Sequence, residues 1–306
     1  MLSYINNSQK KGTSNFNLKK INKNEIFLNK RELNYEYVKK IIMKITIFTS
    51  NQPRHLAFIK KLSKISDEVH AIIEVNTVFP GSNPDFFKKS DIMQKYFHNV
   101  LSAEKKIFGN IDFLPQNVSS LILKLGDLNN LDPIILKKAI DADLIIIFGS
   151  SYIKGELIDK LVEKKAINIH MGISPYYRGS SCNFWALYDK KPELVGATVH
   201  YISKGLDSGK ILFHALPKPA RINSFELGMQ AVWATQESLI EKIGNNELFD
   251  LIPIQQNKNL EIRYSKNIEF TDEVASDYLI SMPQIEDIFN SLSQRNIENF
   301  INPSIK

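Results

Sequence analysis

A run of apolar residues at 143–148, with the sequence DLIIIF, constrains the fold of this chain more than any other stretch. A strand with one face in water alternates polar and apolar residues, whereas this run is apolar throughout after its first residue. Uninterrupted runs of this kind are typical of strands buried on both faces of a parallel sheet. The run therefore predicts a central strand with helices packed above and below it.

Similar strand patterns alternate with helical patterns over the first two thirds of the chain. The strands are predicted at 44–50, 69–75, 119–124, 143–148 and 166–170. The helices are predicted at 53–65, 89–108, 133–140 and 156–163. This alternation is typical of a doubly wound, Rossmann-like α/β sheet, in which ligands bind at the carboxyl ends of the strands.

The charge of the chain is concentrated at its N-terminus. Residues 1–42 hold nine of the 39 basic residues and three of the 33 acidic ones, so the remainder of the chain holds 30 of each. A protein that grips a polyanion needs a basic surface, so this neutral body argues against a nucleic-acid partner. We expect a basic, polar extension over 1–42 and a catalytic core over 43–220.

The last part of the chain, residues 221–306, is expected to form a mixed, mostly helical appendage. The patterns predict helices at 224–243, 271–279 and 283–300, and a strand at 260–264. These elements lack the run of five strands that a small closed β-barrel would need. Packing, dimerisation and capture of substrate are all open roles for this region.

Two polar side chains stand side by side at the end of the predicted strand 166–170. Alternation along a strand places Asn168 and His170 on one face, with Ile167 and Ile169 on the other. Asp207 lies 37 residues after His170, in a loop between the glycines 205 and 209. The strands predicted at 196–202 and 210–214 flank this loop. The amide donor and the imidazole would thus lie together at the carboxyl edge of the sheet, where ligands bind.

These residues belong to a longer pattern that resembles the folate-dependent formyltransferases. The pattern reads Asn-Ile-His, Pro-x-Tyr-Arg-Gly, Trp-Ala-Leu, Gly-Ala-Thr-Val-His and Gly-Leu-Asp-Ser-Gly-x-Ile-Leu, in this order. The resemblance is strong over 142–216 and weaker over 44–141. It implies transfer of a formyl group from N10-formyltetrahydrofolate to a primary amine, with Asn168, His170 and Asp207 as the catalytic trio.

The resemblance also implies a folate site around the loop after the strand 143–148. Backbone groups of this loop would read the pterin ring, with apolar side chains against its faces. The implied cofactor-binding residues are Phe148, Gly149, Ser150, Tyr152, Ile153, Leu157, Gly205 and Leu206. No metal is expected. The lone cysteine, Cys182, excludes an intramolecular disulfide and a cysteine-rich metal site.

Two features that mark particular branches of that family are missing from this sequence, and their absence limits the choice of amine acceptor. The turn at 51–55 has no glycine-rich phosphate loop such as the glycinamide ribonucleotide enzymes carry. At this turn, Arg54 and His55 are open to two interpretations: solvated residues at a helix start, or contacts to an anionic substrate. The appendage predicted at 221–306 also lacks the barrel that holds tRNA in the methionyl-tRNA branch. With both features missing, the resemblance favours an amine on a nucleotide-linked sugar as the acceptor. The expected substrate-binding residues are Tyr177, Arg178, Gly179, Asn183 and Trp185.

Several alternatives remain at this point. The acceptor could instead be methionyl-tRNA or glycinamide ribonucleotide, water could replace the amine in a deformylase, or the chain could bind folate or sugar without turnover. No run of 18 apolar residues and no apolar leader are found, so a cytoplasmic protein is expected, with a homodimer as an option.

Overall fold

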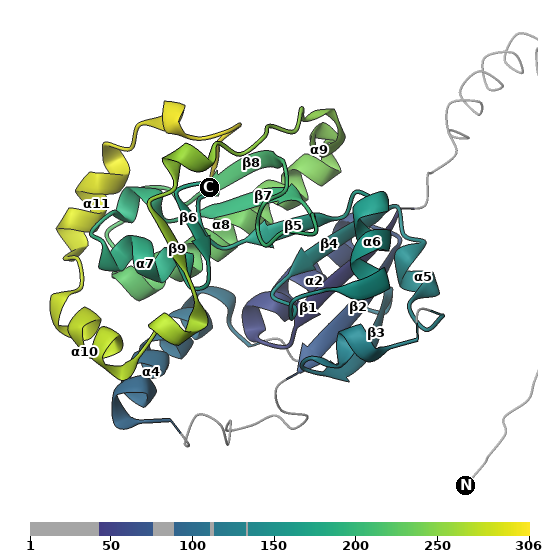
Figure 1. Ribbon diagram of the computed structural model, residues 1–306, viewed down its shortest axis with the longest axis horizontal. Coiled ribbons are helices and arrows are strands. Elements are labelled where there is room, and N and C mark those ends of the chain that lie inside the picture. Colours follow the sequence, from purple (N-terminus) through teal and green to yellow (C-terminus); the bar gives the residue numbers. More distant parts are fainter. Residues whose placement is uncertain (1–42, 76–88, 111–112, 133) are drawn as a thin grey trace, which may run out of the picture. The chain divides into compact units, whose positions relative to one another are not determined.

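The computed structural model describes residues 43–75, 89–110, 113–132 and 134–306. The extension predicted at 1–42 lies outside these residues. The described part is built around an eight-stranded sheet with the order β10-β8-β7-β5-β4-β1-β2-β3 (Figure 1). Helices flank both faces of this sheet, as predicted for a Rossmann-like α/β fold.

Five strands form the parallel half of the sheet. They are β1 (Lys44–Ser50), β2 (Glu68–Val75), β3 (Val118–Lys124), β4 (Leu144–Phe148) and β5 (Ile167–His170). The apolar run forms β4, which is buried along its whole length between β1 and β5. Chain order runs from β1 outward to β3 on one side and from β4 to β5 on the other. The carboxyl ends of β1 and β4 therefore mark the switch point where such sheets bind ligands.

The other half of the sheet contains the predicted hairpin. β7 (Ala197–Tyr201) runs antiparallel to β5, and β8 (Ile211–Leu216) runs antiparallel to β7. β10 (Ser304–Ile305), which the sequence patterns did not predict, pairs with β8. The C-terminal appendage thus ends as the edge strand of the main sheet.

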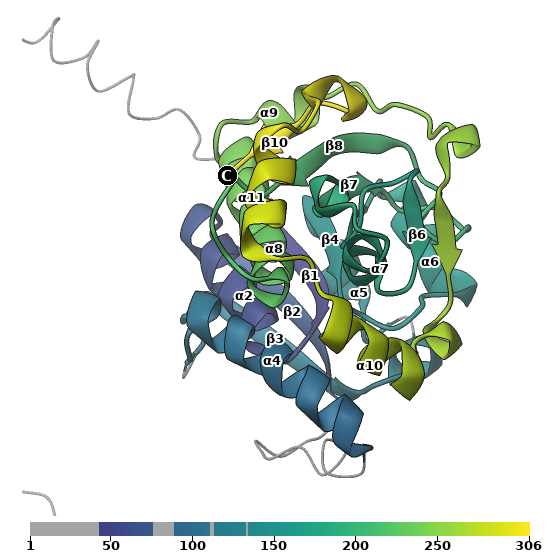
Figure 2. The ribbon, with the colours of Figure 1, turned by 90° about the vertical axis from the view of Figure 1, so that its left-hand side faces the viewer.

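Helices cover the sheet in two layers, which Figure 2 shows from the side. One layer contains α2 (Pro53–Ile65), α4 (Asp91–Phe108) and α8 (Ser224–Gly244). The other contains the short α5 (Lys137–Ile140) and α6 (Gly155–Glu163). Alternate residues of β4 pack against the two layers. Ile146 lies in the core shared with α2 and α8, and Ile145 and Ile147 lie in a second core shared with α5 and α6.

A third core joins the C-terminal helices to the middle of the chain. The helices involved are α7 (Cys182–Tyr188), α10 (Asp272–Ser281) and α11 (Ile285–Ser293). The short helix α9 (Glu247–Asp250) follows α8 and does not belong to this core. A cluster of aromatic rings around Tyr96 and Phe184 fills this core. None of the helices described is long and apolar enough to cross a membrane.

Some predicted boundaries are wrong. The helix predicted at 283–300 ends at Ser293, because a separate 3-10 turn follows at Ile297–Asn299, with the Asn296 side chain accepting from Glu298 N. The strand predicted at 260–264 is β9 (Arg263–Ser265), and residues 177–179, expected as loop, form β6 (Tyr177–Gly179). β6 and β9 pair in a second, parallel sheet, and no hairpin or periodicity signals a contact between three-residue strands so far apart in the chain.

Candidate active site

A cavity of about 650 Å³ opens at the carboxyl ends of β1, β4 and β5, at the switch point of the sheet. Its volume lies in the range of small-molecule sites. The predicted catalytic residues Asn168, His170 and Asp207 all line it. So do most predicted cofactor residues and one predicted substrate residue, namely Phe148, Gly149, Ser150, Tyr152, Ile153, Gly205, Leu206 and Gly179.

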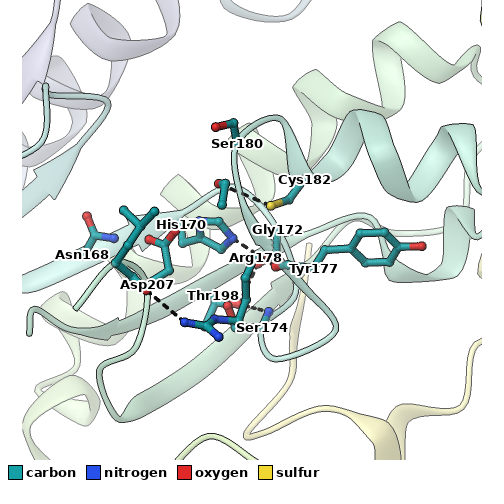
Figure 3. Close-up of polar contacts among 12 residues, drawn as sticks. Asn168, His170, Gly172, Ser174, Tyr177, Arg178, Ser180, Cys182, Thr198 and Asp207 are labelled. Atoms are coloured by element: carbon teal, nitrogen blue, oxygen red, sulfur yellow. Dashed lines mark hydrogen bonds and ion pairs between the residues drawn. The ribbon is translucent and has the colours of Figure 1, made fainter. Parts of the chain in front are cut away.

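The trio is brought together by the geometry of β5 and of the loop between β7 and β8. His170 Nδ1 lies 3.3 Å from Asp207 Oδ2, and both side chains are largely buried. On the other side of the ring, His170 Nε2 lies 3.2 Å from the Tyr177 carbonyl oxygen (Figure 3). Both neighbours offer oxygen atoms to the ring, so Asp207 and the Tyr177 carbonyl together fix its orientation.

A second histidine, His200 on β7, was not predicted as a site residue. Its Nδ1 lies 2.8 Å from the Tyr201 carbonyl, and its Nε2 lies 3.1 Å from Asn168 Nδ2. Burial lowers the pKa of His200 to about 4, so the ring is neutral near pH 7. Nδ1 therefore carries the proton that is donated to Tyr201, and Nε2 accepts from the Asn168 amide. The ring fixes the amide with its nitrogen toward His200 and leaves the second N–H of that nitrogen free.

Period-two alternation and strand register could have revealed His200. β5 and β7 pair with Asn168 opposite His200 and with His170 opposite Thr198. The Gly-Ala-Thr-Val-His motif was recognised only as part of the family pattern. Its last residue is His200, whose place opposite Asn168 follows only from the pairing of β5 with β7. The sequence alone does not give the register of that pairing.

The loop after β4 is shaped by a close approach of His55. Gly149 has φ +75°, and a Cβ on it would lie 2.5 Å from His55 Nε2, so a side chain there would both strain the backbone and clash. His55 packs edge-on against Phe148, with ring centroids 4.7 Å apart. Its pKa lies well below the usual value because the ring is buried and because Arg54 is close. His55 is thus a buried part of the cavity wall. The interpretation of His55 as a solvated residue at the start of the helix is therefore wrong.

The same loop is held from behind by a buried carboxylate. Glu74 accepts from the Ser151 backbone N at 2.6 Å, from the Ser151 hydroxyl at 2.8 Å and from Gly126 N at 2.9 Å. These bonds fix the main chain at 149–153 and leave its cavity side lined by apolar groups. The apolar lining residues are Leu125, Ile147, Phe148, Ile153, Ile158, Ile202 and Leu206. A fixed main-chain edge beside an apolar wall suits a flat heterocycle such as a pterin.

Five of the predicted site residues lie away from the cavity lining. Leu157 lines a separate cavity of about 320 Å³. The other four, Tyr177, Arg178, Asn183 and Trp185, were expected to bind substrate. The Tyr177 ring points away from the trio (Figure 3), and its hydroxyl donates to Asp189 at 3.1 Å. Arg178 donates to Glu261 Oε2 at 2.9 Å and to the Leu206 carbonyl at 3.1 Å.

The two remaining residues belong to α7, whose inner face packs in the third core. Trp185 is buried there, with the Arg263 guanidinium 4.3 Å from its ring centroid. The Asn183 side chain accepts from Gly196 N at 3.1 Å. Neither side chain therefore lies in the cavity lining: Trp185 packs in the third core, and Asn183 is bonded to the main chain at Gly196.

Other lining residues come from the β1–α2 turn and from the C-terminal segment. Sequence reasoning left out Ser50, Gln52, Ser180, Ser181 and Asn267. Arg54, the one cationic side chain in the described lining besides the histidines, donates to the buried Glu104 Oε1 at 2.8 Å. Asp207 is the one carboxylate in that lining. Within the described residues, no group of three or more His, Cys, Asp or Glu side chains could hold a metal ion.

With this geometry established, comparisons with known proteins identify the family. The model of the formyl transferase family matches residues 43–220, which is more than half of the chain. The chain therefore belongs to the formyl transferase family. The match contains the whole parallel half of the sheet and the three residues Asn168, His170 and Asp207.

Individual relatives are more distant. Methionyl-tRNA formyltransferase of Synechococcus sp. (strain JA-3-3Ab) is 30% identical over 128 residues, which are 41% of this chain and 39% of that protein. The chain spans less than half of the length of the curated relatives it matches first.

Two solved structures are similar to this chain at low identity. The 4-N formyltransferase from Francisella tularensis is 18% identical with a TM-score of 0.47, over 75% of this chain and 78% of that one. The phosphoribosylglycinamide formyltransferase from Anaplasma phagocytophilum is 17% identical with a TM-score of 0.44, over 74% and 99%.

Proposed function

We propose that this chain transfers a formyl group from N10-formyltetrahydrofolate to a primary amine. The observation that carries the proposal is the meeting of Asn168, His170 and Asp207 at one cavity, inside the stretch that matches the family. The critical atom in such a transfer is the formyl oxygen, on which negative charge grows as the amine attacks. A site for this reaction needs a fixed donor for that oxygen and a path for the amine proton.

Asn168 supplies the donor. One N–H of its amide is directed at His200 Nε2, and the second is free for the formyl oxygen. In comparable acyl transfers one such donor lowers the barrier by about 3–4 kcal/mol. A neutral His200 is required, because a protonated ring would have no lone pair with which to accept from Asn168.

His170 and Asp207 handle the proton. Asp207 Oδ2 faces His170 Nδ1 at 3.3 Å, which orients the imidazole within the cavity. Asp207 is also the one carboxylate in the described lining, so it is the natural relay for the proton, which leaves the attacking amine and ends on the folate nitrogen as the bond from that nitrogen to the formyl carbon breaks.

The cofactor proposal rests on the fit of the apolar wall. The fixed main chain at 149–153 and the surrounding isoleucines suit a flat ring with a donor–acceptor edge. When bound, N10-formyltetrahydrofolate supplies the one-carbon unit, which the protein side chains do not carry.

For the acceptor, we propose an amino sugar linked to a nucleotide diphosphate. Three features of this chain support it. The turn at 51–54 has no glycine-rich phosphate loop, residues 221–306 form helices and short strands with no barrel of their own, and the sequence from 43 onward carries no net charge. A long polyanion such as tRNA finds little basic surface here. A location for the amine beside Gly179, Ser180 and Asn267 follows from the polar lining at that side.

A competition experiment tests the acceptor separately from the reaction. Nucleotide-linked 4-amino-4,6-dideoxyhexoses, glycinamide ribonucleotide and methionyl-tRNA are offered at equal concentration with formyl-folate, and the mass gain of one formyl group is measured on each. We expect formylation of a sugar. Efficient formylation of either other acceptor, with no sugar product across several nucleotides and epimers, would overturn the sugar assignment and leave formyl transfer standing.

A further inference from the structure

The loop that carries Asp207 adopts a backbone conformation that needs outside support. Asp207 has φ +47°, in the left-handed region that residues with a side chain rarely occupy. Its loop spans residues 202–210 between β7 and β8 and is only partly buried. Conformations of this kind persist where the surrounding structure holds them, and here the orientation of a carboxylate depends on it.

Gln256 provides such support from the C-terminal segment. Its side chain is buried, and its Nε2 donates to the Asp207 carbonyl at 2.8 Å and to the Gly209 carbonyl at 2.8 Å. The segment is itself anchored, because Ile254 and Ile211 form a bridge with two backbone hydrogen bonds of 2.8 Å. The donor therefore lies two residues from a fixed point on β8.

A second tie reaches the loop from β6 and is itself held by the C-terminal segment. Arg178 donates to the Leu206 carbonyl and is itself held by Glu261 Oε2 at 2.9 Å. Three main-chain carbonyls in four residues of the loop thus accept from side chains that lie outside the loop. The carbonyls belong to Leu206, Asp207 and Gly209.

We infer that Gln256 is a positioning residue, which holds the Asp207 carboxylate in contact with His170 by fixing the main chain on both sides of Ser208. The inference rests on the proposed function and extends it to the C-terminal segment. Residue 256 lies beyond the stretch 43–220 that matches the family and outside the cavity lining, so Gln256 would contribute to the catalytic geometry from the appendage without itself contacting substrate.

The test compares Gln256→Met, which keeps the length of the side chain and removes its donor, with Gln255→Met. Gln255 is the exposed neighbour of the same type and serves as the matched control. We expect Gln256→Met to lower kcat about 10- to 100-fold, as for loss of two hydrogen bonds. The KM values for formyl-folate and amine should stay within about twofold, because no substrate contact is removed.

The effect should depend on the carboxylate that Gln256 positions. In an Asp207→Asn background, Gln256→Met should change kcat less than about twofold, because residues that act as a unit are not additive. A purely structural glutamine would give the same fractional loss in both backgrounds, and that result would overturn the inference.

Hydrogen exchange of residues 203–210 gives a readout that needs no turnover. Gln256→Met should speed amide exchange there about tenfold or more relative to Gln255→Met, since the loop loses two ties. Unchanged exchange would overturn the inference even in an active enzyme. If the wild-type chain forms no formylated amine, the proposed function fails, and the exchange result still decides whether Gln256 holds the loop.

Gln256→Glu is a second variant, which keeps the inference testable if Gln256→Met does not fold. Glutamate has the same shape but turns an acceptor toward two carbonyls, so it should disturb the loop at least as much as methionine while keeping the volume. If both variants lose the cooperative unfolding transition, Gln256 supports the core rather than the loop, and the inference is wrong.

Discussion

The chain builds two walls of the cavity by different means. The sheet wall consists of the ends of β4 and β5 with the loops at 149–153 and 203–207. Its side chains project from strands that are buried in the main sheet. The C-terminal wall consists of residues 179–181 and 267, and its frame is the pairing of β6 with β9. That frame joins segments far apart in the chain mainly through backbone hydrogen bonds, such as Ser180 N to Ser265 O at 2.9 Å.

The two walls therefore suit different tasks: the sheet wall suits the chemical step, and the C-terminal wall suits recognition of the acceptor. Side chains on the sheet wall are placed by strand geometry, which suits groups that must sit within tenths of an ångström of a reacting atom. The C-terminal wall is set by the main chain, so its side chains can vary without loss of the frame. We therefore expect substitutions in the sheet wall to act on turnover or folate, and substitutions in the C-terminal wall to act on the acceptor.

The largest effect is expected from the chemistry of the sheet wall. His170→Ala and Asn168→Ala should each lower kcat at least ~100-fold, through loss of the proton-handling ring or of the oxyanion donor. Steady-state kinetics with formyl-folate and amine measures this, with cooperative unfolding as the check on the fold. His98→Ala, at an exposed histidine, is the control. Turnover close to wild type in either variant would refute the assignment.

A smaller effect, confined to folate, is expected at Gly149. In Gly149→Ala the new methyl group would lie 2.5 Å from His55 Nε2 at a φ of +75°. The loop must shift, so the KM for formyl-folate should rise about 10- to 30-fold, since positive φ and the contact together cost about 1–2 kcal/mol. The KM for the amine should change little. Equal changes in both KM values would argue against separate walls.

Gly179→Ala is the matching change in the C-terminal wall, with an effect of about tenfold or less. Gly179 has φ +89°, and a Cβ there would meet the Ser265 carbonyl oxygen at 2.1 Å, so β6 and β9 must separate locally. The KM for the amine should rise and that for formyl-folate should not. Gly228→Ala, in α8 with no atom near the new methyl group, is the control. A rise in the folate KM instead would reverse the assignment of the two walls.

The last effect concerns stability, because His200 and His214 are both buried as neutral rings. His200 accepts from Asn168, and His214 accepts from Ile301 N at 3.0 Å and donates to the Ser174 carbonyl at 2.9 Å. Burial lowers both pKa values to about 4, whereas the unfolded chain takes up these protons near pH 6.5. The unfolded state therefore binds more protons between these values, and the free energy of unfolding falls as the pH drops from about 6.5 toward 4.

The expected slope is up to about 1.4 kcal/mol per pH unit for each histidine. Urea unfolding at pH 7, 6 and 5 measures it. His214→Gln should reduce the slope by roughly one histidine's share, and His98→Gln should leave it unchanged. A free energy of unfolding that is flat between pH 6.5 and 5 would contradict neutral burial of these rings.

The sheet wall was largely predictable from the sequence, and the C-terminal wall was not. The apolar run at β4 and the alternation in β5 are local signals, and they are enough to place Asn168 and His170 on one face of a strand. The contact of Asp207 with His170 needed the family pattern. Arg178 was predicted to meet substrate, but its guanidinium is held by Glu261, a partner 83 residues away. Gln256 and Asn267 carried no local signal, because their roles depend on which distant backbone lies beside them.

The most direct test of the central claim is a single-turnover reaction with isotopically labelled formyl-folate and an excess of the nucleotide-linked amino sugars. The account predicts that labelled formyl appears on the amine in a one-to-one ratio with released tetrahydrofolate, and that His170→Ala abolishes both within the same time. Release of labelled formate with no formylated amine would show a hydrolase, and the absence of any release would show a binding protein. Either result, across the full panel of amines, would contradict the account.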